Sequence, residues 1–165
     1  MSLHDISISE EVTKRLICDH IPVSEIQNAV DHCVSTRKMI IEANSGLYTG
    51  YMKIGGIVLW VQFFIPAGQA VIADYYYNKT DITGFSDETL KENTKISPFL
   101  EKYATKKIIC CKCDLELELK KVFFKYLKHP YSSVSYVCSS CGQVFVPKEL
   151  IAHQAEQIET LLEQK

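Results

Sequence analysis

The sequence predicts an α+β protein built from two modules that a linker joins. Two amphipathic segments of helical period come first, and three runs rich in β-branched and aromatic residues follow them. The second half of the chain then brings five cysteines within 32 residues. These observations divide the chain into an α+β module at 1–84, a linker with short helical turns at 85–104 and a cysteine-bearing module at 105–165. The two modules are expected to be separately stable.

Two helices are predicted ahead of the first strand. Ser7 and Glu10 have the spacing of a capping box, so a first helix is expected near residues 9–18. A second helix begins near Ser24, and its apolar residues recur at the helical period: Ile26, Ala29, Val30, Cys33 and Val34. Cys33 therefore belongs to a buried stripe, where a thiol behaves as a small apolar group.

The sequence period changes from helical to extended after Arg37. Three runs separated by glycine and proline signals predict an antiparallel meander, namely 46–54, 56–65 and 70–77. The meander concentrates aromatic residues: Tyr48, Tyr51, Trp60, Tyr75, Tyr76 and Tyr77. Core packing accounts for such residues. The alternative is that one sheet face, with Tyr75 and Tyr77, is exposed and anchors a partner.

Residues 78–104 are polar and rich in turn-forming residues, which is typical of a linker. Within them, Ser97 and Pro98 predict the start of one short helix, because serine caps helices and proline is favoured at the first helical position.

Two cysteine pairs have the spacing of a metal site. Two residues lie between Cys110 and Cys113, two lie between Cys138 and Cys141, and 24 residues separate the pairs. Zinc bound by four thiolates needs a tetrahedron, and a two-residue gap lets a tight turn present two sulfurs to one ion. The segment between the pairs alternates apolar and polar residues and predicts a β-hairpin that turns near His129. The predicted order is a knuckle, a hairpin, a second knuckle, a strand and a terminal helix. This order predicts a zinc ribbon with these four cysteines as ligands.

Cys111 is a spare thiol in the first pair. Its spacing to Cys113 does not suit a ribbon knuckle, so its side chain is expected to point away from the ion. The alternative is a redox-sensitive thiol or a substitute ligand. His129 and His153 are ligands in principle, but four cysteines already complete the site.

Iron is the alternative to zinc, because rubredoxin binds iron with the same four thiolates and carries electrons. A glycine after the second cysteine of each knuckle helps the backbone approach sulfur. Gly142 follows one pair but Asp114 follows the other, which argues against iron.

The stretch from Cys110 to Lys165 resembles a bacterial family of small zinc-ribbon-like proteins sometimes labelled redox proteins. The resemblance is carried by CxKC, VFFKYL, CxxCGQVFVPKEL and ETLLEQK. IPVSEIQNAV, with the tryptophan-containing strand after it, is similar to segments found alongside pyridine-nucleotide and flavin oxidoreductases of anaerobes. These resemblances imply a metal-bearing accessory role. Cys111 and Asp114 depart from the usual first knuckle of the family.

The net charge and the absence of known catalytic motifs in the sequence restrict the classes of function. The net charge is −2, and residues 105–165 hold nine lysines against seven acidic residues, so the basic stripe of a nucleic-acid binder is missing. A nucleic-acid-binding ribbon is therefore only the second alternative. The sequence has no Gly-rich phosphate loop, no HExxH and no nucleophile elbow, so no catalysis is expected.

The favoured interpretation is a non-catalytic accessory or adaptor protein, associated with a redox enzyme system, that binds a protein partner. The alternative is that the protein self-associates as a homodimer through its terminal helix. The N-terminal MSLHDISISEE lacks a basic start and an apolar core, and no apolar run reaches the roughly 18 residues of a membrane span. We therefore expect a cytoplasmic protein that does not enter the membrane.

Overall fold

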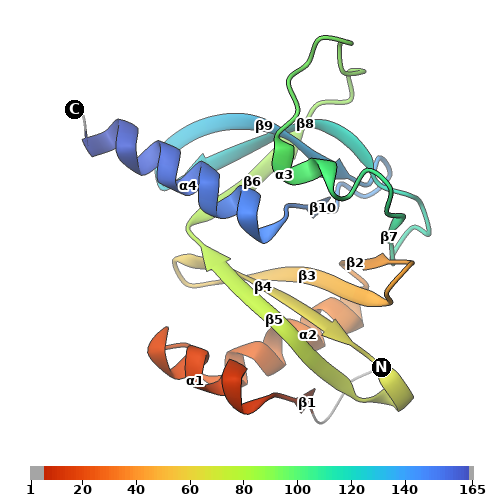
Figure 1. Ribbon diagram of the computed structural model, residues 1–165, viewed down its shortest axis with the longest axis vertical. Coiled ribbons are helices and arrows are strands. Elements are labelled where there is room, and N and C mark those ends of the chain that lie inside the picture. Colours follow the sequence, from red (N-terminus) through yellow and green to blue (C-terminus); the bar gives the residue numbers. More distant parts are fainter. Residues whose placement is uncertain (1–5, 164–165) are drawn as a thin grey trace.

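The computed structural model describes residues 6–163, and within them the chain forms two β-sheets and four α-helices (Figure 1). The first sheet has six strands in the order β1-β5-β4-β3-β2-β7, and the second has four in the order β10-β9-β8-β6. The strands are β1 (Ile6–Ser7), β2 (Met39–Glu42), β3 (Leu47–Ile54), β4 (Ile57–Phe64), β5 (Ala70–Asn78), β6 (Thr80–Phe85), β7 (Ile108–Cys110), β8 (Glu118–Tyr126), β9 (His129–Val137) and β10 (Val144–Phe145). The helices are α1 (Glu10–Cys18), α2 (Val23–Thr36), α3 (Pro98–Glu101) and α4 (Lys148–Glu163), with one 3-10 turn, η1 (Pro66–Gly68).

The predicted fold class is wrong, because the N-terminal two-helix and meander module does not close on itself and the cysteine-bearing part is not a free-standing ribbon. The meander forms as β3, β4 and β5, but β7 pairs with β2 at one edge of the same sheet. In return β6 pairs with β8 in the second sheet. Each part of the chain thus gives a strand to the other part's sheet, and the protein is β-rich with two interlocked sheets.

The local sequence indicates β6 and β7, the two strands that pair with the other part's sheet, only weakly. β7 is three residues long, and β6 is six residues long and interrupted by a register shift beside Gly84. Tertiary pairing decides whether such short segments are strands, because strand propensity depends strongly on context.

The two predicted helices are present, but their caps differ from those expected. The Ser9 hydroxyl, not that of Ser7, accepts the Val12 N–H at 3.2 Å and caps α1. α2 starts after Pro22, and no side chain caps it. In Figure 1, α1 and α2 lie on the face of the first sheet that is opposite the second sheet.

Strand β4 shows how both faces of the first sheet are buried. Leu59, Val61 and Phe63 pack against the core under α1 and α2, whereas Val58 and Trp60 pack into the core shared with the second sheet. Alternate side chains of a strand point to opposite faces, so β4 reads as a nearly continuous apolar run.

The exposed aromatic face, which was the alternative to core packing, is not present. Trp60 lies between Tyr51 and Tyr76, with ring centroids 4.5 and 5.5 Å away, and this stack is covered by the second sheet. Tyr75 is 1% exposed on the helix side, and only Tyr77 of the expected anchor pair is accessible, at 43%. Within residues 6–163, none of the helices combines the length and the apolar character needed to cross a membrane.

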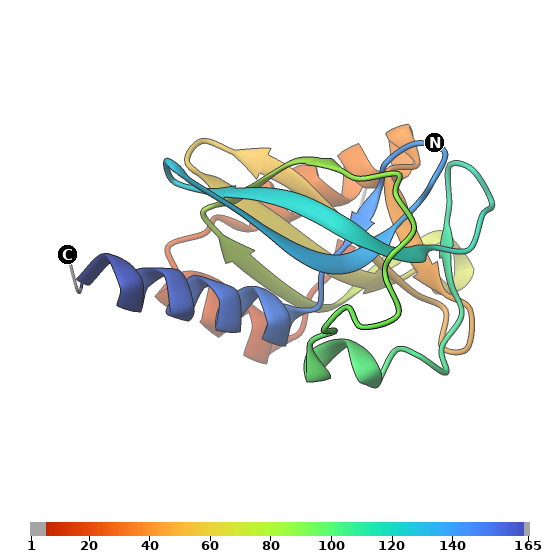
Figure 2. The same cartoon turned by 90° about the horizontal axis from the view of Figure 1, so that it is seen from above.

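Helix α4 packs beside β5, and an ionic contact ties the two elements to α1 (Figures 1 and 2). Asp74 accepts from Arg15 at 2.7 Å and lies 3.3 Å from the Lys148 ammonium. Burial raises the pKa of the Asp74 carboxyl, but the hydrogen bonds from Arg15 and from the Tyr75 N–H, together with Lys148, outweigh it and leave that pKa below its usual value.

The Asp74 contact predicts a pH-dependent contribution to stability. A carboxyl whose folded-state pKa is lowered stabilises the fold above its unfolded pKa, about 3.9, and loses that contribution as the pH falls through the folded-state pKa. We expect Asp74→Asn to cost about 1 kcal/mol at pH 7, which is less than the roughly 1.5–3 kcal/mol of a typical bond to a charged group, because Arg15 is 39% exposed. Urea unfolding of the parent protein and the variant at pH 7 and near pH 3 measures this loss of unfolding free energy. An equal cost at both pH values would contradict the role assigned to the charge.

Candidate metal centre

The four cysteines of the two pairs converge where the two sheets meet. Cys110 ends β7 in the first sheet, and Cys138 directly follows β9 in the second. Their partners, Cys113 and Cys141, lie three residues further along each turn. All four Sγ atoms lie within 4.8 Å of one another, and those of Cys110 and Cys141 are 3.5 Å apart.

The first knuckle is a tight turn closed by backbone hydrogen bonds. The Cys110 N–H donates to the Leu115 carbonyl at 2.8 Å, and the Asp114 N–H donates to the Cys110 carbonyl at 2.8 Å. To close this turn Asp114 adopts a left-handed φ of 56°. Aspartate tolerates that conformation better than most residues because its short polar side chain can bond locally.

The second knuckle repeats the first. The Cys138 N–H donates to the Gln143 carbonyl at 2.8 Å, and the Gly142 N–H donates to the Cys138 carbonyl at 2.9 Å. Gly142 has a φ of 80°, so Asp114 and Gly142 hold equivalent places in the two turns. The difference in residue type, which argued against iron, therefore does not alter the backbone.

The donor set fits a metal ion. A tetrahedral zinc–thiolate site with bonds near 2.3 Å places its sulfurs about 3.8 Å apart, which is close to the spacing of these thiols. Cys110 and Cys138 are fully buried, Cys113 is half-buried and Cys141 is exposed. The four cysteines together can hold a metal ion whose outer side lies near the surface.

The surroundings of the thiols differ in their effect on ionisation. Burial raises the pKa of the Cys141 thiol to about 12, and the neighbouring thiols add to that effect. Cys138 is also desolvated, but the backbone N–H groups of Cys141 and Ser140 together with adjacent thiols lower its pKa. Four thiolates so close together repel one another, and a bound cation is the ordinary means of keeping them all deprotonated.

The remaining candidate ligands lie elsewhere. Cys111 is half-buried against the core under α1 and α2, and its N–H donates to the Met39 carbonyl at 3.0 Å. Burial raises the pKa of its thiol to about 11. His129 begins β9 beyond the hairpin turn, which falls at residues 127–128, and His153 lies on α4 with its ring 5.3 Å from that of Phe99. Neither histidine joins the cysteine cluster found among residues 6–163.

Phe85 is a neighbour of the site that the sequence interpretation placed in the linker. A Cβ built on Gly142 would lie 3.1 Å from the edge of the Phe85 ring, so this side chain of β6 covers the second knuckle. The short polar run TDITGF, which ends at Phe85, carries no local signal that distinguishes a strand from a linker.

The two knuckles should tolerate substitution unequally. Gly142→Ala places a side chain both at a left-handed φ and against the Phe85 ring, so we expect a loss of about 1–3 kcal/mol. Asp114→Gly removes a Cβ from the same backbone conformation and should be neutral or stabilising by up to about 1 kcal/mol. Thermal unfolding of both variants, with their metal content, measures the difference. Equal costs would contradict both the strain at the left-handed φ of Gly142 and the restriction by the Phe85 ring.

Fold and site together describe a β-rich protein with four clustered cysteines that can bind a metal. Residues 106–165 match a domain family described as a domain of unknown function (DUF7479), over the region for which a resemblance was noted above. A search among curated proteins found no match, and a search among solved structures found none either.

Proposed function

We propose that the protein is a non-catalytic zinc protein in which a Zn(Cys)4 centre fastens the two sheets together. The observation that carries the proposal is the clustering of the Cys110, Cys113, Cys138 and Cys141 thiols within 4.8 Å of one another. Each sheet contributes one knuckle, so an ion bound by all four would cross-link β7 to β9. A four-thiolate set also fills the coordination sphere of zinc and leaves no position for an activated water.

Iron is the second candidate, and the equivalence of the two knuckles favours it. The backbone amides of Lys112 and Cys113 act to lower the pKa of Cys110, and those of Ser140 and Cys141 act to lower the pKa of Cys138. Such N–H donors tune the potential of iron–thiolate sites. An iron-loaded protein would be an electron carrier.

Metal analysis of the purified protein separates the two candidates. The zinc proposal expects a colourless protein with one zinc per chain. A red protein with one iron per chain, bleached reversibly by a reductant, would replace the zinc proposal with the iron one. Cys111→Ser should keep the metal in either case, because Cys111 lies outside the cluster.

We also propose a cytoplasmic accessory role with a protein partner. The paired spacing of the cysteines, which is typical of a metal site and not of a disulfide framework, supports a reducing compartment. With Tyr75 buried, Tyr77 is the exposed anchor, and its hydroxyl lies 3.3 Å from the Asp19 carboxylate. A homodimer through α4 is the alternative, supported by Leu161, which is 61% exposed.

Substitution of the two exposed side chains tests the partner proposal. Tyr77→Ala should weaken salt-resistant capture of a protein partner from native lysate at least tenfold, whereas Leu161→Ala should leave it unchanged. The reverse result, with Leu161→Ala also abolishing self-association, would favour the homodimer.

A further inference from the structure

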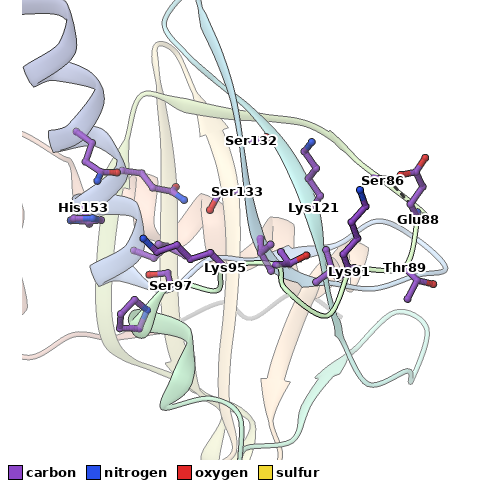
Figure 3. A pocket seen from close by; sticks show the side chains of 17 residues that line it. Ser86, Glu88, Thr89, Lys91, Lys95, Ser97, Lys121, Ser132, Ser133 and His153 are labelled. Atoms are coloured by element: carbon purple, nitrogen blue, oxygen red, sulfur yellow. Dashed lines mark hydrogen bonds between the residues drawn. The ribbon is translucent and has the colours of Figure 1, made fainter.

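A cavity of about 790 Å³ lies away from the cysteine cluster, between the 86–98 segment, strands β8 and β9, and helix α4 (Figure 3). Its lining contains none of the cysteines, so the metal proposal does not account for it. Cavities of roughly 300–1,000 Å³ are the size that small organic ligands and cofactors occupy.

The lining of this cavity is positively charged. Lys91 and Lys95 come from the 86–98 segment and Lys121 comes from β8, while Glu88 is the one carboxylate in the lining. Within residues 6–163, no carboxylate lies within ion-pair distance of these three lysines. The Lys121 ammonium lies 5.8 Å from the centre of the Phe123 ring. In Figure 3, Lys95 extends toward His153 on α4. Three unpaired ammonium groups favour a ligand with two or more negative charges.

A buried amide in the lining also has a free donor. Gln154 is only 7% exposed, and its carbonyl oxygen accepts the Tyr131 hydroxyl at 3.3 Å. That bond orients the side chain, and among the described residues its NH2 group has no hydrogen-bond partner. The NH2 group is open to the solvent in the cavity, so it is free to donate to a ligand there. Ser132 and Ser133 also line the cavity.

Apolar side chains complete the lining at Leu90, Val134 and Leu150, of which Val134 and Leu150 are buried. An inorganic anion would leave these side chains and most of the volume unused. The combination of charged groups and an apolar wall is suited to an organic molecule with an anionic end and an uncharged body.

We propose that this cavity binds a small phosphate-bearing organic molecule of nucleoside diphosphate size. Its phosphates contact Lys91, Lys95 and Lys121, and its uncharged body lies against Leu90, Val134 and Leu150. The Gln154 amide donates to the ligand.

Titration of the metal-loaded full-length protein with ADP, followed by the NMR shifts of its backbone amides, tests the proposal. We expect saturable shifts at Lys91, Lys95, Lys121 and Gln154, and weaker binding of pyrophosphate and of adenosine than of ADP. The Lys91→Gln, Lys95→Gln double variant should lose affinity at least tenfold. Lys125→Gln is the matched control, because Lys125 is exposed on the same strand as Lys121 but outside the cavity lining.

Three outcomes overturn the proposal. One is the absence of saturable shifts up to millimolar ADP, and another is binding that Lys125→Gln weakens as much as the double variant does. The third is adenosine binding as tightly as ADP, which would show that the lysines do not recognise phosphate. Unchanged metal content and Trp60 fluorescence in each variant establish that the fold is intact.

Discussion

Removal of the metal is expected to unfold both sheets together. The first knuckle extends from the sheet that α1 and α2 cover and the second from the other sheet, so an ion bound by both knuckles would cross-link the sheets. Structural zinc supplies on the order of 10–16 kcal/mol of apparent folding free energy in small zinc peptides, whereas a whole domain is stable by about 5–15 kcal/mol. Loss of the ion therefore removes an amount comparable to the entire stability.

Trp60 reports this event without a label. It is the one tryptophan in the sequence and is 2% exposed in the core between the sheets. On addition of a strong chelator we expect its emission to shift to the red in step with the loss of circular dichroism from the β-sheets. Cys138→Ser should behave like the chelated protein, and Cys18→Ser, which changes an exposed thiol on α1, should behave like the parent. An unchanged Trp60 emission in metal-free protein would contradict the cross-link.

The isolated fragment 1–84 is expected not to fold into a stable unit. In the whole protein, Ile40, Val58, Trp60 and Tyr76 are covered by residues that follow position 84 and are each 2–5% exposed. Full burial of one such side chain is worth about 1.5–3 kcal/mol, so the fragment forfeits about 6–12 kcal/mol. It also lacks β7, so β2 keeps its pairing with β3 but has no partner along its outer edge.

Thermal unfolding and hydrogen exchange of the fragment check this expectation. The full chain should show one cooperative transition, and the fragment should show none and should exchange its β4 amides rapidly. A cooperative transition in fragment 1–84 would instead support the separately stable modules that composition and linker pattern predict.

The sequence was most informative where local chemistry is specific. The apolar spacing from Ile26 to Cys33 predicted α2 and its buried face, and those residues are buried. The runs that form β3, β4 and β5 were predicted as an antiparallel meander and pair as one. The fold brings together the four thiols whose spacing in the sequence predicts a metal site. That these thiols bind metal stays a prediction.

The long-range pairings could not be predicted from local patterns. TDITGF forms β6 because β8 lies beside it, and nothing within those six residues distinguishes this pairing from a polar loop. Packing of the second sheet likewise determines that the side chains of Trp60 and Tyr76 are buried. Each alternates along its strand with a residue of the other face, Leu59 or Tyr75, and that alternation is compatible with a sheet buried on one face or on both. The cavity is lined by Lys91 and Lys121, which are 30 positions apart along the chain, and no sequence spacing predicts that they lie together.

X-ray absorption spectroscopy of the metal in the purified protein tests the central claim most directly, because it measures the ligand atoms themselves. We expect zinc with four sulfur ligands at about 2.3 Å and no nitrogen or oxygen in the first shell. The Cys141→Ser variant should lose the metal or replace one sulfur by a lighter atom, whereas Cys111→Ser should give the spectrum of the parent. Nitrogen or oxygen ligands in the parent protein, or a parent protein that binds no metal, would contradict the four-cysteine centre.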